Sequence, residues 1–82
     1  MIAPAQCRAA RALLEMDQAV LASAANVSRN TIVDFEKGRR VPTPNNLAAI
    51  QRALEAAGVE FIAENGGGPG VRLRDRKEMS HA

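Results

Sequence analysis

The spacing of apolar and small residues between Gln18 and Phe35 constrains the fold of this chain more than any other feature of its sequence. It follows the pattern of two short helices that cross steeply through a tight turn. Ala22 is small enough for the helices to approach closely, and Asn26 tolerates the left-handed backbone that a sharp turn requires. The apolar and small positions of the pattern are Leu21, Ala22, Ala25, Val27, Ile32 and Phe35.

The rest of the chain must build a small core around this unit. The 82 residues suit one compact domain, and Phe35 and Phe61 are the only aromatic residues. Small aliphatic side chains therefore fill most of the core, which favours short, closely packed helices. Cys7 is the only cysteine, so an internal disulfide is excluded, and we expect this residue to be a small buried hydrophobe.

Capping residues and apolar spacing predict four helices. The expected ranges are 4–15, 18–24 after Asp17 as cap, 28–37 with Ser28 as cap and Gly38 as its end, and 44–57 between Thr43 and Gly58. The expected apolar or inward positions are Cys7, Ala10, Leu13 and Leu14 in the first helix, Val20, Leu21 and Ala24 in the second, Ile32 and Phe35 in the third, and Leu47, Ile50 and Leu54 in the fourth.

The sequence changes character after Gly58. Strand formers at 59–62 and 71–73 flank a glycine- and proline-rich loop at 65–70, which predicts a β-hairpin. A lone hairpin is marginal in water, so we expect residues 59–74 to form a dimerisation element with the apolar residues Val59, Phe61, Val71 and Leu73 at the interface. Residues 75–82 are polar and are predicted to form a flexible tail.

The charged residues and the lack of catalytic motifs limit which kinds of function the chain can have. The net charge is only +2, but positive residues gather at Arg8 and Arg11, at 37–40 and at 72–77, which permits nucleic-acid binding without establishing it. The only histidine is His81, and no catalytic set, metal-ligand spacing or phosphate-binding loop is present, so we expect no enzyme, no metal and no cofactor. No apolar run is long enough to span a membrane and no leader precedes the first helix, so a cytoplasmic protein is expected.

One set of residues matches the pattern of a known family: Arg11, Gln18, Leu21, Ala22, Val27, Ser28, Ile32, Phe35, Glu36, Gly38, Pro42 and the apolar stripe at 47–54. On these residues the chain resembles the Cro and phage-repressor family of helix-turn-helix regulators, also called the xenobiotic-response-element family, from Arg8 to about Gly58. The resemblance implies a mainly α, four-helix lambda-repressor-like DNA-binding domain over residues 1–58, here with a C-terminal β-hairpin where many relatives have a fifth helix. Asn26 replaces a usual glycine, and Ala19 and Val20 stand where many relatives have acidic residues.

The resemblance also implies roles for individual residues. The second helix of the motif would enter the major groove with Ser28, Arg29, Asn30, Val33 and Asp34, and Lys37 lies on the same outward line as Arg29. Gln18 would contact a phosphate, and Arg39 and Arg40 would hold the DNA backbone, although a purely solvated role stays open for these two arginines and is favoured for 72–77. Arg11 and Glu36 would form a structural ion pair between the first and third helices.

The expected function is sequence-specific binding of double-stranded DNA by a homodimeric transcriptional regulator, a repressor. A role of another class stays open: the chain would be an antitoxin or adaptor whose hairpin and tail bind a protein partner. The sequence also does not separate a host regulator from a phage repressor.

Overall fold

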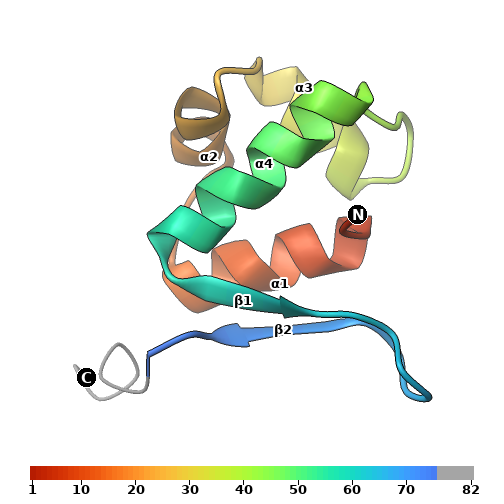
Figure 1. Ribbon diagram of the computed structural model, residues 1–82. Coiled ribbons are helices and arrows are strands. Elements are labelled where there is room, and N and C mark those ends of the chain that lie inside the picture. The colour runs from red at the N-terminus through yellow and green to blue at the C-terminus, as the bar shows by residue number, and fades with distance from the viewer. Residues whose placement is uncertain (76–82) are drawn as a thin grey trace.

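The computed structural model describes residues 1–75 and consists of four helices followed by a two-stranded antiparallel hairpin (Figure 1). This confirms the predicted mainly helical fold. Of the predicted tail at 75–82, residues 76–82 lie outside the described residues. The elements are α1 (Pro4–Leu14), α2 (Gln18–Ala25), α3 (Arg29–Glu36), α4 (Pro44–Ala57), β1 (Val59–Ile62) and β2 (Gly70–Leu73).

Local capping chemistry sets most of these bounds. The side chains of Asp17, Ser28 and Thr43 each accept a hydrogen bond from the backbone N–H three residues later, at the start of α2, α3 and α4. Asn26 ends α2 with a φ of 57°, as the turn of the motif requires. Gly58 ends α4 with a φ of 126°, a conformation that side chains disfavour.

The four helices pack around a core of small and aliphatic side chains. Leu21, Ile32, Ile50 and Leu54 are among the largest fully buried side chains, and Cys7 is also fully buried, as the sequence indicated. These residues come from all four helices, so the core joins the whole helical part of the chain.

The inward face of α2 was predicted incorrectly at two positions. Val20 is 52% exposed and Ala24 is also exposed, whereas Leu21, Ala22 and Ala25 are buried. After Gln18, all residues of α2 except Ser23 are apolar, so its sequence does not define a single apolar face. Contacts with α3 and α4 decide which residues face inward. Leu13 of α1 is likewise 40% exposed, while Leu14 packs against the core.

The hairpin covers the core beneath α1. In its register Val59 lies opposite Leu73, and Phe61 lies opposite Val71, so these four side chains share one face. That face turns toward the helices: Val59 is 1% exposed, and the other three pack partly buried against the core. Val59 is therefore unavailable to a second chain. The apolar face that we expected at a dimer interface instead completes the core that four short helices leave open.

Polar contacts fix both ends of the hairpin. The buried Gln6 of α1 donates from Nε2 to the carbonyl of Gly70 at 2.9 Å, next to the loop. At the other end, the backbone N–H of Arg74 donates to the carbonyl of Gly58 at 2.9 Å, and its guanidinium donates to the carbonyl of Glu55. The hairpin is thus attached to α1 and to the end of α4. Within residues 1–75 no helix has both the length and the apolar character needed to cross a bilayer.

Candidate nucleic-acid interface

The helix α3 exposes one face because the other is anchored in the core. Ile32 and Phe35 are buried at 0% and 3% exposure, and they direct the opposite side of the helix outward. Arg29 and Asn30, in the first turn, are exposed, as is Lys37 just after the helix. The predicted positions Val33 and Asp34 are half-buried, and Ser28 caps the helix at its exposed start.

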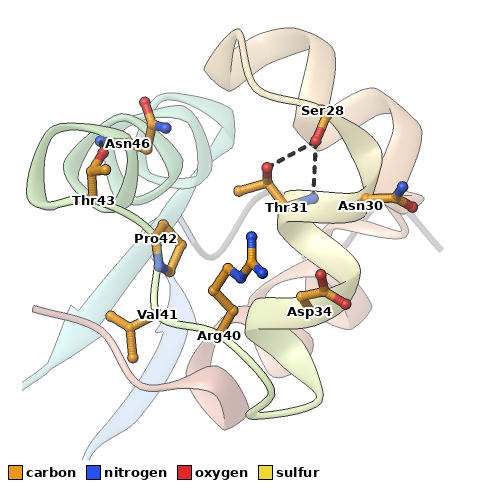
Figure 2. Close-up of a pocket in the computed structure, with 9 residues that line it drawn as sticks. All are labelled: Ser28, Asn30, Thr31, Asp34, Arg40, Val41, Pro42, Thr43 and Asn46. Atoms are coloured by element: carbon orange, nitrogen blue, oxygen red, sulfur yellow. Dashed lines mark hydrogen bonds between the residues drawn. The ribbon is translucent and has the colours of Figure 1, made fainter.

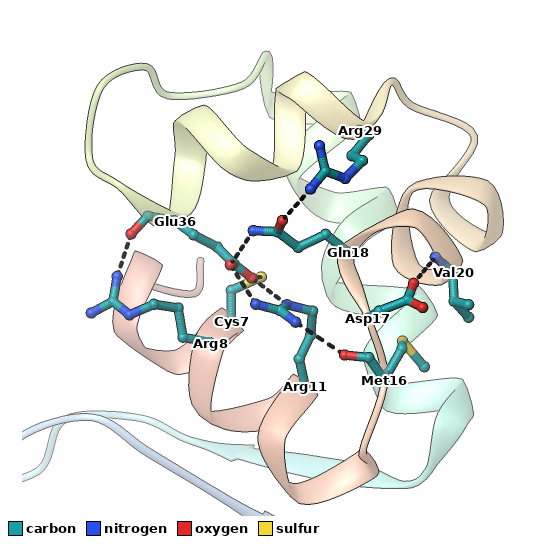
Figure 3. A network of polar contacts seen from close by, with 9 residues as sticks. All are labelled: Cys7, Arg8, Arg11, Met16, Asp17, Gln18, Val20, Arg29 and Glu36. Carbon is teal, nitrogen blue, oxygen red and sulfur yellow. Dashed lines mark hydrogen bonds and ion pairs between the residues drawn. The ribbon is translucent and has the colours of Figure 1, made fainter.

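The carboxylate of Glu36, at the end of α3, is the centre of a buried polar network (Figure 3). Glu36 is 3% exposed, and its two oxygens accept hydrogen bonds from Nε and Nη2 of Arg11, each at 2.7 Å. This two-point contact is the strongest geometry for an arginine and a carboxylate. The ion pair implied by the resemblance is therefore present, and it joins α1 to α3.

Two further donors reach the same carboxylate. The thiol of Cys7 donates to Oε2 of Glu36 at 3.1 Å, and Nε2 of Gln18 donates to Oε1 at 3.0 Å. Arg8 adds a hydrogen bond to the backbone carbonyl of Glu36, which lies at the C-terminus of α3. Donors from α1 and α2 therefore hold α3 in a fixed orientation, and no buried side-chain polar atom among the described residues lacks a partner.

The network keeps the buried Glu36 charged. Burial acts to raise the pKa of Glu36, but the hydrogen bonds from Arg11, Cys7 and Gln18 together outweigh it, so the pKa lies below its ordinary value. The hydrogen bond to Glu36 also raises the pKa of Arg11. Burial, with the hydrogen bond to Glu36, raises the pKa of Cys7 far above its ordinary value. Cys7 is thus a protonated donor and not a nucleophile.

Gln18 forms hydrogen bonds both to the buried Glu36 and to the exposed start of α3. An ionised carboxylate only accepts hydrogen bonds, so Gln18 must turn its amide nitrogen toward Glu36. Its Oε1 then faces outward and accepts from Nη2 of Arg29 at 3.4 Å (Figure 3). The half-buried Gln18 therefore connects the buried ion pair with the first residue of α3.

A polar hollow lies between α3 and the start of α4 (Figure 2). Sequence reasoning had assigned Ser28, Asn30, Asp34 and Arg40 to the functional surface, and all four line this hollow. It had missed three polar neighbours. The complete lining is Ser28, Asn30, Thr31, Asp34, Arg40, Val41, Pro42, Thr43 and Asn46.

The acidic residue in this surface has a basic neighbour. Oδ1 of Asp34 lies 3.9 Å from Nη1 of Arg39. The side chain of Arg39 is exposed and that of Asp34 is half-buried, so the contact is loose and partly screened by water. The backbone carbonyl of Asp34 also accepts the N–H of Arg39 at 2.9 Å. The negative charge on α3 is therefore partly offset within the protein.

The comparison with protein families agrees with this geometry. A family model described as helix-turn-helix matches residues 8–61, which is more than half of the 82 residues. The chain belongs to the helix-turn-helix family of Cro and the phage repressors. It is therefore a DNA-binding transcriptional regulator, and its family is one of regulators and not of enzymes. No curated protein matches the chain.

In this helix-turn-helix regulator, the predicted site residues form one continuous region around α3. Gln18 and Arg29 are in contact, Asp34 and Arg39 lie close together, and Lys37 and Arg40 are exposed at the end of the helix and in the loop that follows. The missed residues are Thr31, Thr43 and Asn46. Of these three residues, the sequence marked only Thr43, and only as a helix cap. The three come together because α4 packs close to α3, which the sequence alone does not show.

Proposed function

We propose that this regulator is a repressor that binds duplex DNA as a homodimer, with α3 of each protomer in the major groove. The observation that carries the proposal is the fixed orientation of α3: the buried Glu36 network holds one side, and Arg29 and Asn30 project from the other into solvent. A rigid helix with exposed polar side chains in its first turn is the arrangement that reads base edges in this class of protein.

The chemistry of the exposed side chains favours base contacts. Arginine matches the two acceptors of guanine and asparagine matches adenine, so Arg29 and Asn30 are the proposed base-reading residues. Val33 would meet a thymine methyl group, and the hydroxyl of Ser28 can serve either type of base. Asp34 would accept from cytosine once its loose contact with Arg39 opens.

Other groups are suited to the DNA backbone. Gln18 lies at the N-terminus of α2, where its amide keeps a second N–H and the helix end offers backbone N–H groups to a phosphate. Lys37, Arg39 and Arg40 are exposed cations after α3. We assign them to phosphate contacts, which add affinity without sequence information.

A homodimer follows from the demands of selectivity. One module of this size contacts few base pairs, whereas two related by a two-fold axis read two half-sites about one helical turn apart. A dimer whose site overlaps a promoter would exclude polymerase sterically, and this is the mode of repression that we propose.

A second candidate function rests on the hairpin. The outer edge of β2 lies away from α4 and could receive a strand from another protein, as in an antitoxin or adaptor. Isolation of the native protein in a stoichiometric complex with an unrelated small chain would favour this function.

Selection of bound duplexes from a random library, followed by hydroxyl-radical footprinting, tests the main proposal. We expect an inverted repeat with two protected regions about 10 base pairs apart and two protomers per duplex. Failure to enrich any sequence, or one protomer bound to an asymmetric site, would contradict it.

A further inference from the structure

The backbone of β2 has an unpaired outer edge. Arg74 donates its N–H to the carbonyl of Gly58, which makes 58 and 74 a hydrogen-bonded pair of the ladder. Because such pairs alternate in an antiparallel sheet, 60 with 72 and 62 with 70 are also bonded pairs. Val71 and Leu73 therefore point their N–H and C=O groups away from β1. Among residues 1–75 no hydrogen bond reaches these groups.

This edge lies at the margin of the molecule. β1 packs against α4 and α1, whereas β2 packs against α1 and is the strand further from α4 in Figure 1. Beside β2, the exposed Ala5 and Ala9 of α1 line a shallow hollow together with Gly70 and Val71. Small side chains at this place leave room for another strand, and its partner helix, to approach β2.

Gly70 is a second, independent indication of a close neighbour. Glycine weakens a strand, and in a strand it often marks the close approach of another backbone. A Cβ atom at Gly70 would meet only Ile62, at 3.7 Å and 3.8 Å, which is ordinary contact, and the backbone here is not left-handed. The packing of residues 1–75 therefore does not require glycine at this position.

We propose that β2 pairs antiparallel with β2 of a second copy of this chain, with the two-fold axis at Val71, to form a continuous four-stranded sheet. The proposal rests on the homodimer proposed above and moves its interface from the apolar face of the hairpin to the edge of β2. Val71 would exchange both backbone hydrogen bonds with Val71 of the second copy. Leu73 would donate to the carbonyl of Pro69 of that copy, so the missing N–H of proline removes one bond at each of the two symmetric positions.

Charge favours this register over those shifted toward Leu73. With the axis at Val71, Arg72 lies directly opposite Gly70 of the second copy. An axis at Arg72 or at Leu73 would instead place Arg72 opposite Arg72 or Arg74 of that copy, and like charges directly opposite each other are destabilising. Within its own hairpin, Arg72 already donates to Oε1 of Glu60 at 2.6 Å, which offsets its charge.

The proposed sheet leaves the DNA-binding surface free. Figure 1 shows α3 on the far side of α1 from the hairpin, and α3 packs on α1 and α2. Pairing at β2 would therefore join two protomers without covering Arg29 or Asn30. In this arrangement α1 of both copies lies on the same face of the sheet, with the exposed Ala5 and Ala9 toward the axis.

Charged substitutions at Gly70 test the register directly. Gly70→Glu would create two symmetric attractive pairs with Arg72 across the axis, and Gly70→Arg would create two repulsive ones. From the usual strength of cross-strand charge pairs we expect the dimer Kd, measured by sedimentation without DNA, to fall about two- to thirtyfold for the first and to rise by a similar factor for the second. Gly67→Glu and Gly67→Arg are the controls, since a side chain there enters open space in the loop.

Hydrogen exchange of the unmodified protein supplies a readout that does not depend on how the variants fold. The amides of Val71 and Leu73 should gain protection as protein concentration rises through the dimer Kd. The amide of Arg72, which bonds within the hairpin, should be protected at every concentration.

Different contrary results would exclude either the β2 interface alone or the homodimer as a whole. If Gly70 and Gly67 variants with equal charge behave alike while the dimer persists, this interface is wrong and the proposed homodimer stands. Protection of Val71 that does not change with concentration, or that needs a different co-purified chain, would also overturn the pairing. A monomer at high micromolar concentration, with and without DNA, would remove the homodimer itself.

Discussion

Replacing Glu36 by glutamine tests whether the buried network holds α3 in place. The substitution keeps the shape of the side chain but leaves Arg11 without its charged partner. Removing one member of a buried ion pair costs about 3 to 5 kcal/mol. The side chain of Arg11 is 20% exposed and can be partly rehydrated, so we expect a loss near the lower end, about 3 kcal/mol.

This loss is large for a protein of this size. A domain of 82 residues typically has a free energy of unfolding of about 4 to 12 kcal/mol. A loss of 3 kcal/mol corresponds to a fall in Tm of about 12 to 24 °C. Urea denaturation at pH 7, followed by far-UV circular dichroism, measures the change. Glu60→Gln is the control, because it removes an exposed ion pair with Arg72 and should cost less than about 1 kcal/mol.

We expect the stability difference between the natural protein and Glu36→Gln to depend on pH. The pKa of Glu36 is lower in the folded protein than in the unfolded chain, where it is about 4.3. Its contribution to stability is therefore fully present above that pH and is lost as pH falls through the lower, folded pKa. The difference in unfolding free energy between the natural protein and Glu36→Gln should shrink below about pH 4.3. If Glu36→Gln stays within about 0.5 kcal/mol of the natural protein at pH 7, the network does not stabilise α3 as argued.

Two further predictions concern reactivity and charge. Cys7 is fully buried with a raised pKa, so a thiol reagent at pH 8 should label it only in denaturant; complete labelling of the native protein within minutes would show that the α1–α3 contact opens. Arg39→Ala and Arg40→Ala should each weaken binding to cognate and random duplexes alike, and each should lower the slope of log affinity against log salt by about one per half-site in titrations at several salt concentrations. An unchanged slope would assign that arginine to solvent.

Much of the fold is encoded in local signals. Asp17, Ser28 and Thr43 cap their helices through their own side chains, and Asn26 and Gly58 adopt the backbone conformations that end helices. These preferences act within a few residues, so the sequence alone places the helix bounds closely. The hairpin also follows from local alternation of apolar and polar residues.

Contacts between distant segments were less predictable. The alanine-rich sequence of α2 does not distinguish Val20 from Ala25, so only packing decides which of them is buried. The hydrogen bond from Cys7 to Glu36 joins residues 29 positions apart, and no local pattern marks it. The inward turn of the hairpin face that contains Val59 likewise depends on the space that the helices leave uncovered.

In the candidate site, too, some residues could be predicted from the sequence and others depend on tertiary packing. Family resemblance assigned Gln18, Arg29 and Asn30 to one surface, and the structure places them around the start of α3. It gave no indication of Thr31 or Asn46, which join the polar hollow because the loop after α3 folds α4 back toward it. Side chains that gather through tertiary packing are therefore the part of the site that sequence reasoning missed.

The base preference of Arg29→Ala tests the central claim, that α3 reads DNA sequence, most directly. The measurement compares the affinity of the natural protein and the variant for the selected duplex and for every single-base change within one half-site. We expect the variant to lose about 1 to 3 kcal/mol on the cognate duplex and to relax its preference at one base position, while its affinity for random DNA changes little. An equal loss on cognate and random duplexes, with the base preference intact at every position, would show that Arg29 contacts only the backbone and that α3 is not the reading helix.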